Sequence, residues 1–255
     1  MNESGLRRCI LVPIDLHGIN RSTLETLVRI ASLLDRKVLG LLLEDMRLQQ
    51  VADLPFTTEI NLDSGRERSF LRDHLSQRHD LISGEARRLL NELAKRHQVE
   101  LSFEDACGRR WPSALERDGH QDIFLPPRRR WHDRVHASGM KAYRVRRLGV
   151  VLAHGLEDER VVATAATLLK ADLVGDVYLL TRRPPLPEQL HQLYRQGHQV
   201  RLQANFSCRA EDLLTLIRQS PYDLLLLPGA CLHDIAPAEL DAALDKASGQ
   251  ILIIN

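Results

Sequence analysis

The chain has 255 residues, of which 44% are hydrophobic and 27% are charged, a composition that is typical of globular proteins and excludes extensive disorder. A formal net charge of +1 excludes a general electrostatic attraction to nucleic acid, and no apolar stretch reaches the roughly 18 residues of a membrane span. The polar N-terminus is not followed by the apolar run of a secretion signal. The four cysteines form no CxxC pair, so we expect a soluble protein of the reducing cytoplasm.

The first predicted elements form a strand, a helix and a second strand. Cys9–Ile14 is a continuous apolar run, which is typical of a buried parallel strand. Ser22 and Glu25 have the spacing of a capping box, so a helix should begin there. Val38–Leu43 is the second strand candidate.

The rest of the first half is less regular. Glu44–Arg66 has weak periodicity and is interpreted as a long connection. A long helix follows over about Arg68–His97, with Gly84 as a candidate break point. The last predicted elements of this half are the strand Val99–Phe103, the helix Trp111–Arg117 and the strand Asp122–Leu125, which Pro126 and Pro127 end.

After a basic linker the alternation of strands and helices starts again. The predicted strands are Leu148–Ala153, Asp176–Leu180, Gln199–Gln203, Tyr222–Leu227 and Gln250–Ile254. The predicted helices are Arg160–Ala171, Glu188–Gln196, Glu211–Gln219 and Pro237–Ala247, the last with proline in its first turn.

The pattern is an internal repeat. Cys9–Asp45 aligns with Leu148–Arg182, and Gln121–Pro127 aligns with Tyr222–Pro228. Alternating strands and helices imply right-handed crossovers and parallel sheets, so we expect an α/β protein with domains at 1–140 and 146–255. Only the second half shows a fifth strand; the edge of the first sheet is either lost or completed by another part of the chain.

The residues Ile10–Asp15 (ILVPID), the run Val38–Leu43, and an Asp before an apolar run at Asp122 and Asp223 resemble the universal stress protein family. The resemblance implies two tandem domains, each an open parallel sheet of order 3-2-1-4-5 with helices on both faces. Ligands of such sheets bind at the carboxyl ends of strands one and four. The candidate ligand-binding residues there are Asp15, Pro126, Arg128, Arg130, His154 and Gly229.

ATP-binding members of that family carry a Gly-x2-Gly-x9-Gly-Ser/Thr motif after strand four, where bare backbone amides approach phosphates. In the first half, prolines and arginines stand at this place. In the second half only Gly229 matches, and Leu232, Ala242 and Ala243 replace the other motif residues. We therefore expect no cofactor and no tight ATP binding, although ATP or AMP stays open as a ligand.

The basic segment has three interpretations. Between Arg128 and Arg147 there are eight basic residues and one acid, Asp133. Such a run is most often a solvated linker, but its guanidinium groups could hold a nucleotide, or it could bind nucleic acid with Trp131 and Tyr143 stacking on bases. His132 and His136 have the spacing of two zinc ligands, but the basic surroundings oppose a dication. We expect no metal.

No catalytic motif is present, so the sequence favours a non-enzymatic adaptor that binds a protein partner in a stress response, with a homodimer and no membrane contact expected. The alternative is an adenine-nucleotide or small-ligand sensor that uses Asp15 and the Arg128–Arg130 cluster. An enzyme of the related nucleotide-binding α/β superfamily is less favoured, because Leu16–Ile19 lacks the second histidine of an HxGH motif.

Overall fold

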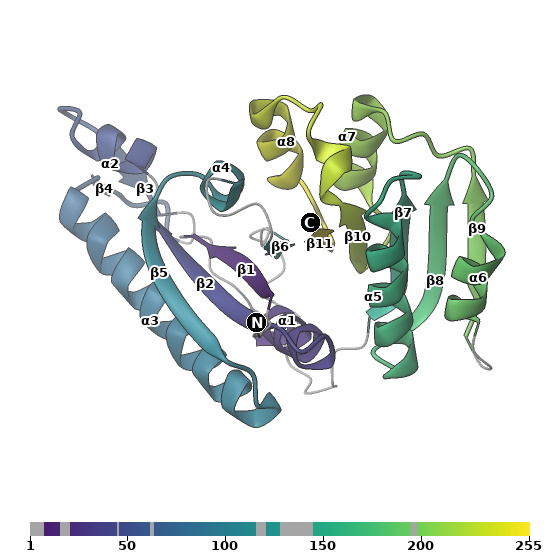
Figure 1. Ribbon diagram of the computed structural model, residues 1–255. Helices are drawn as coiled ribbons and strands as arrows, with labels where there is room; N and C mark the ends of the chain where they lie inside the picture. Colours follow the sequence, from purple (N-terminus) through teal and green to yellow (C-terminus); the bar gives the residue numbers. More distant parts are fainter. Residues whose placement is uncertain are drawn as a thin grey trace, which may run out of the picture.

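The computed structural model describes residues 8–15, 21–44, 46–61, 64–115, 121–127, 145–194 and 198–255. It is an α/β structure with a large central sheet (Figure 1). The nine strands of that sheet are β1 (Cys9–Ile14), β2 (Lys37–Glu44), β5 (Leu101–Cys107), β6 (Asp122–Leu125), β7 (Val145–Leu152), β8 (Val174–Thr181), β9 (Val200–Ala204), β10 (Leu224–Pro228) and β11 (Gln250–Ile254). The helices are α1 (Arg21–Leu33), α2 (Met46–Ala52), α3 (Arg72–His97), α4 (Arg110–Leu115), α5 (Asp158–Lys170), α6 (Pro187–Leu193), α7 (Ala210–Gln219), α8 (Pro237–Leu244) and the short 3-10 helix η2 (Gly229–Leu232).

The sheet joins both halves of the chain. Its order is β5-β2-β1-β6-β11-β10-β7-β8-β9. All neighbouring strands are parallel except β6 and β11, which pair antiparallel with Phe124 opposite Leu252. The expectation of two separate sheets is therefore wrong, because β11 supplies the neighbour that β6 lacks in its own half. Of the two outcomes expected for the first half's edge, completion by another part of the chain is confirmed.

The antiparallel pairing of β6 with β11, which we call the joint, determines at which edge of the sheet each strand ends. Because β1 and β6 run one way and β7, β10 and β11 run the other, the carboxyl ends of the two sets lie at opposite edges of the sheet. The residue after β11 confirms this arrangement, since the backbone N–H of Asn255 donates to the carboxylate of Asp122 at the start of β6.

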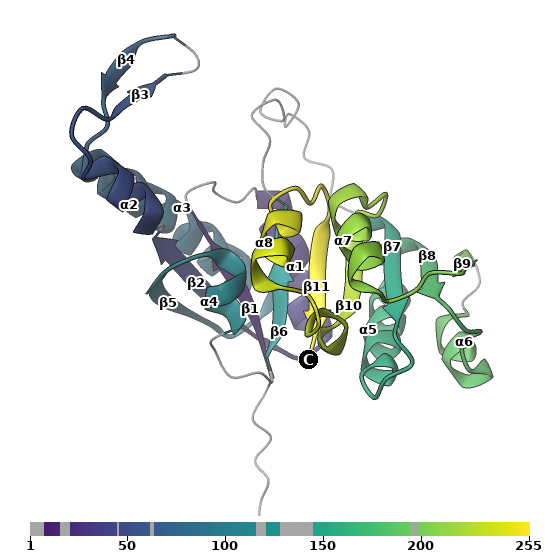
Figure 2. The same cartoon turned by 90° about the horizontal axis from the view of Figure 1, so that it is seen from above.

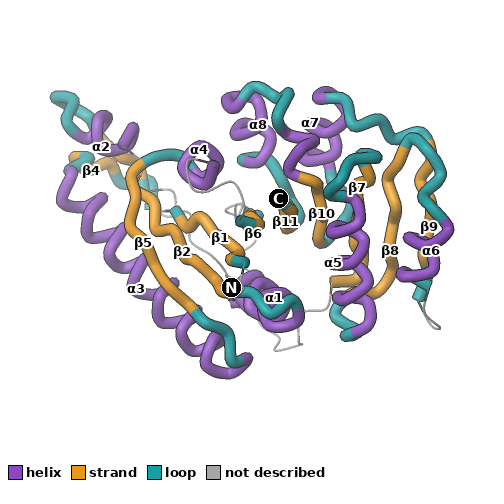
Figure 3. The backbone as a smooth tube through the Cα atoms, in the orientation of Figure 1, coloured by secondary structure: helices purple, strands orange, loops and turns teal. Residues whose placement is uncertain are grey.

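Helices cover both faces of the sheet (Figure 3). α1, α3, α5 and α6 pack on one face, and α4, α7 and α8 pack on the other. Each face has one apolar core that draws side chains from both halves. Strands such as Gln250–Ile254 are buried along their whole length, as expected for a sheet covered on both sides.

The segment expected to be a long connection contains an arm that the sequence did not predict. It consists of α2 and of a two-stranded antiparallel hairpin, β3 (Thr58–Ile60) and β4 (Glu67–Ser69). Figure 2 shows the hairpin projecting away from the sheet. α3 continues unbroken through Gly84, because one interior glycine costs a helix only about 1 kcal/mol and buried side chains lie on both sides of it, Leu75 before and Leu89 after.

Candidate functional site

The six candidate residues divide between the two opposite edges. Asp15 follows β1 and is half-buried, and Pro126 follows β6 and is buried. Arg128 and Arg130 lie outside the described residues. His154 follows β7 and is exposed, whereas Gly229 follows β10 and is buried. Parallel pairing brings together the ends of β1 and β6, and separately the ends of β7 and β10.

The first-half edge, at the carboxyl ends of β1 and β6, contacts α4. The candidate residues predicted from the sequence did not include any residue of α4. The buried guanidinium of Arg110 donates to the Pro126 carbonyl at 2.6 Å. Its neighbour Arg109 forms an ion pair with Asp241 of α8, a carboxylate that is only 2% exposed. The edge that carries Asp15 and Pro126 is thus tied to a helix of the second half.

At the second-half edge the chain's own side chains lie where an anion would be expected. A Cβ at Gly229 would stand 1.8 Å from the Oδ1 atom of Asn255, so the bare backbone of the glycine faces that amide group. The next backbone N–H, from Ala230, donates to the Glu157 carboxylate at 3.0 Å. A carboxylate of the chain therefore already accepts the hydrogen bond of the backbone amide that follows Gly229.

In the loop after β7, too, a carboxylate of the chain accepts hydrogen bonds from the backbone N–H groups. The buried carboxylate of Asp158 accepts hydrogen bonds from the backbone N–H groups of Ala153 and His154, at 3.0 and 2.8 Å. His154 adopts a left-handed backbone with φ of 62°, and its Nε2 lies 2.9 Å from Oγ1 of Thr181 in β8. Because β7 separates β8 from β10, the imidazole points away from Gly229.

A buried carboxylate lies where the two halves meet. Asp122 is 1% exposed; its carboxylate is 3.4 Å from the Arg160 guanidinium of α5 and 3.9 Å from that of Arg36, and it accepts the Asn255 N–H at 3.2 Å. Burial raises the pKa of Asp122 above its ordinary value of 3.8, although the Asn255 hydrogen bond and the charge of Arg36 oppose that shift.

This raised pKa predicts a pH dependence of stability. The folded state holds the Asp122 proton more tightly than the unfolded state, so its contribution to stability is fully present below pH 3.8 and is lost as the pH rises through the folded-state pKa. In Asp122→Asn this contribution is absent. Denaturant unfolding at several pH values should show the free energy of unfolding of the wild type falling relative to the variant as the pH rises. A constant difference across the range would contradict the assignment.

Two thiols also meet at the second-half edge. Cys208, before α7, and Cys231, in η2, are hydrogen-bonded to each other although 22 residues lie between them in the sequence. The spacing gave no signal for this contact, because the fold alone brings the two segments together. Among the described residues no group of three or more His, Cys, Asp or Glu side chains could hold a metal ion, and none of the described helices has the length and apolarity to cross a membrane.

No protein-family model matches the chain, and none of the curated proteins matches it.

Proposed function

We propose that the protein is a non-enzymatic binding protein of the stress response, built from two universal-stress-protein-like halves that do not use the family's nucleotide site. The strand orders support the likeness. The first half runs β5-β2-β1-β6 and the second runs β9-β8-β7-β10-β11, which correspond to orders 3-2-1-4 and 3-2-1-4-5. In both halves the first strand lies between the second and the fourth.

The observation that supports the proposal most is that the chain's own side chains fill the edge of the sheet at the carboxyl ends of β7 and β10. A phosphate held there would need free backbone amides and an open approach to a glycine. Glu157 instead accepts from the Ala230 amide, and Asn255 lies against Gly229. A nucleotide would have to displace a carboxylate that is already hydrogen-bonded, and its own negative charge would repel that carboxylate.

Titration calorimetry with ATP and AMP tests the proposal, with Asp15→Ala and Arg128→Ala/Arg130→Ala as variants. We expect no binding tighter than about 1 mM, which corresponds to about −4 kcal/mol. Micromolar binding that these variants weaken would instead establish the nucleotide sensor. Turnover of the nucleotide would overturn both functions.

One observation favours the sensor as the second candidate. The first-half edge carries a buried guanidinium, that of Arg110, next to the candidate residue Pro126. A positive charge in a poorly solvated place favours anionic ligands. Arg110→Met should therefore abolish nucleotide binding if the sensor function holds, and should leave the calorimetric baseline unchanged if the adaptor function holds.

The arm offers a surface for the partner that an adaptor requires, and the partner we assign to it is a second copy of the chain. Its apolar side chains are exposed, Phe56 at 99%, Ile60 at 63% and Leu54 at 58%, and such groups mark interaction sites when they gather. Glu59 and Arg68 of the hairpin already pair with each other. The exposed apolar groups would form the centre of a symmetric contact between identical arms.

Phe56 provides the sharpest test of this contact, because it combines full exposure with a left-handed φ of 64°, which costs a bulky residue about 1–2 kcal/mol. Phe56→Gly should therefore leave the stability of the fold unchanged or raise it by up to about 1 kcal/mol. The same change should weaken self-association by about tenfold or more. Sedimentation velocity over a range of concentrations measures this.

Leu156→Ala is the matched control, since Leu156 is fully exposed but lies in the second half. It should leave self-association unchanged. A wild-type chain that stays monomeric at every concentration would overturn the homodimer.

A further inference from the structure

The thiols of Cys208 and Cys231 form a short hydrogen-bond chain at the carboxyl ends of β7 and β10. The thiol of Cys231 bonds to that of Cys208, and the Cys208 thiol donates to the carbonyl of Leu152, the last residue of β7, at 3.7 Å. Both cysteines are half-buried. The other two cysteines, Cys9 in β1 and Cys107 in β5, belong to the first half.

The environment makes the two thiols chemically unequal. The hydrogen bond from Cys231 lowers the pKa of Cys208, although burial and the carboxylates of Asp158 and Asp212 oppose that effect. The same bond, together with burial, raises the pKa of Cys231. Since the thiolate is the nucleophile, Cys208 is the thiol suited to attack an oxidant first. Cys231 is the thiol suited to react with the oxidised Cys208 afterwards.

We propose that Cys208 and Cys231 are a peroxide-sensitive pair that is reversibly oxidised to an intramolecular disulfide. The Cys208 thiolate attacks one oxygen of hydrogen peroxide and breaks the O–O bond, which leaves a sulfenic acid at Cys208 and, after proton uptake, one water. The Cys231 sulfur then displaces the sulfenic oxygen, which leaves as a second water. Both sulfurs are thereby oxidised, the peroxide is reduced, and an external dithiol restores the pair.

The disulfide would change how the second half is held together. Cys208 lies in the connection from β9 to α7, and Cys231 lies in the helix that follows β10. Oxidation would tie this connection covalently to η2, next to the Ala230 amide that Glu157 caps. The inference is independent of the proposed adaptor function, because it rests on the two thiols alone.

The experiment uses the full chain with Cys9→Ser/Cys107→Ser as the background, so that only the proposed pair can react. After peroxide treatment, thiol titration should fall from two groups to none, and dithiothreitol should restore both. Trypsin cleaves at Arg209 and Arg218, so non-reducing mass spectrometry should find the two cysteines on linked peptides. The oxidised chain should also melt about 5 °C higher than the reduced chain.

Single replacements test the separate roles. In Cys231→Ser, peroxide should leave a sulfenic acid at Cys208 that dimedone traps, whereas in Cys208→Ser dimedone should label nothing. Iodoacetamide should modify Cys208 about tenfold faster than Cys231 in the reduced chain. Persistence of both thiols in the background variant, or linkage only between two chains, would overturn the proposal. Circular dichroism checks that each serine variant is folded.

Discussion

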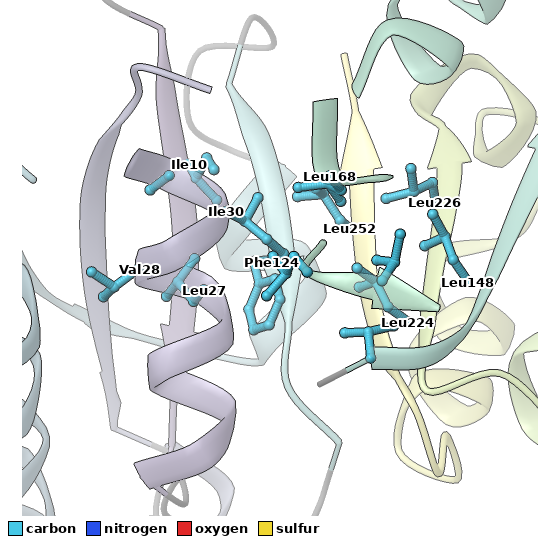
Figure 4. Close-up of a cluster of buried hydrophobic side chains, with 14 of the residues drawn as sticks. Ile10, Leu27, Val28, Ile30, Phe124, Leu148, Leu168, Leu224, Leu226 and Leu252 are labelled. Carbon is cyan, nitrogen blue, oxygen red and sulfur yellow. The ribbon is translucent and has the colours of Figure 1, made fainter. Parts of the chain in front are cut away.

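Replacing Phe124 by Ala should lower the free energy of unfolding by about 3–5 kcal/mol and should destabilise both halves in one transition. Phe124 is 0% exposed and faces Leu252 across the joint between β6 and β11. Figure 4 shows its ring within the core, among side chains that include Ile30 of the first half and Leu168 of the second. Calorimetry and circular dichroism should give coincident transitions in the wild type and in the variant.

Phe103→Ala is the matched control for this prediction. Phe103 is only partly buried and lies in β5, the outermost strand of the first half. The same truncation there should cost clearly less than at the joint, because less apolar surface is lost and the remaining space opens to solvent. Two separate melting transitions, of which Phe124→Ala shifts only one, would show that the halves unfold independently.

The ion pair between Arg109 and Asp241 predicts the second large effect, on the opposite face of the sheet from α1 and α5. Arg109→Ala removes the guanidinium from a carboxylate that is 2% exposed. Removing one partner of a buried pair costs about 3–5 kcal/mol. Because the Arg109 side chain is 36% exposed, solvent screens the pair in part and we expect a loss of about 2–3 kcal/mol.

A double-mutant cycle separates this pair from packing losses. Asp241→Asn removes the buried charge, so Arg109→Ala should cost much less in that background than in the wild type. Arg109→Lys keeps the positive charge and should recover part of the loss. Equal costs of Arg109→Ala in both backgrounds would mean that the ion pair does not stabilise the contact between α4 and α8.

The sequence predicted the strands well where an apolar run has sharp limits. Cys9–Ile14, Asp122–Leu125 and Gln250–Ile254 appear with the ends expected from the sequence. Each is buried along most or all of its length, so its hydrophobic signal is continuous and the flanking polar residues or prolines mark its ends. Helices such as Pro237–Leu244 were also found, but their ends moved by up to a few residues.

The arm and the joint could not be predicted in the same way. α2 buries none of its side chains, and the strands of the hairpin have only three residues each, so neither leaves a hydrophobic period in the sequence. The pairing of β6 with β11 depends on two distant segments that meet only in the folded chain. Local periodicity predicts that a strand forms and carries no information about such a neighbour.

The candidate site shows what sequence patterns can and cannot indicate. Gly229 was selected as a ligand-binding candidate because it matches the first glycine of a phosphate-binding motif, and the structure places Asn255 where a Cβ at this position would stand. The sequence analysis missed the roles of Glu157 and Asp158, which accept hydrogen bonds from backbone amides. A signal was present, because acidic residues at the start of a helix are typical of groups that interact with free backbone amides. The contact between Cys208 and Cys231 has no sequence signal at all.

The central position of β11 has a consequence for how the protein is made. During synthesis β6 emerges 125 positions before β11 begins, which is roughly 6–25 s at about 5–20 residues per second. Throughout that interval the first half presents a short strand with three consecutive apolar residues and an unpaired edge, the kind of template to which other chains add. The growing polypeptide therefore passes through an aggregation-prone stage in every round of translation, and holding chaperones that shield this edge should raise its soluble yield.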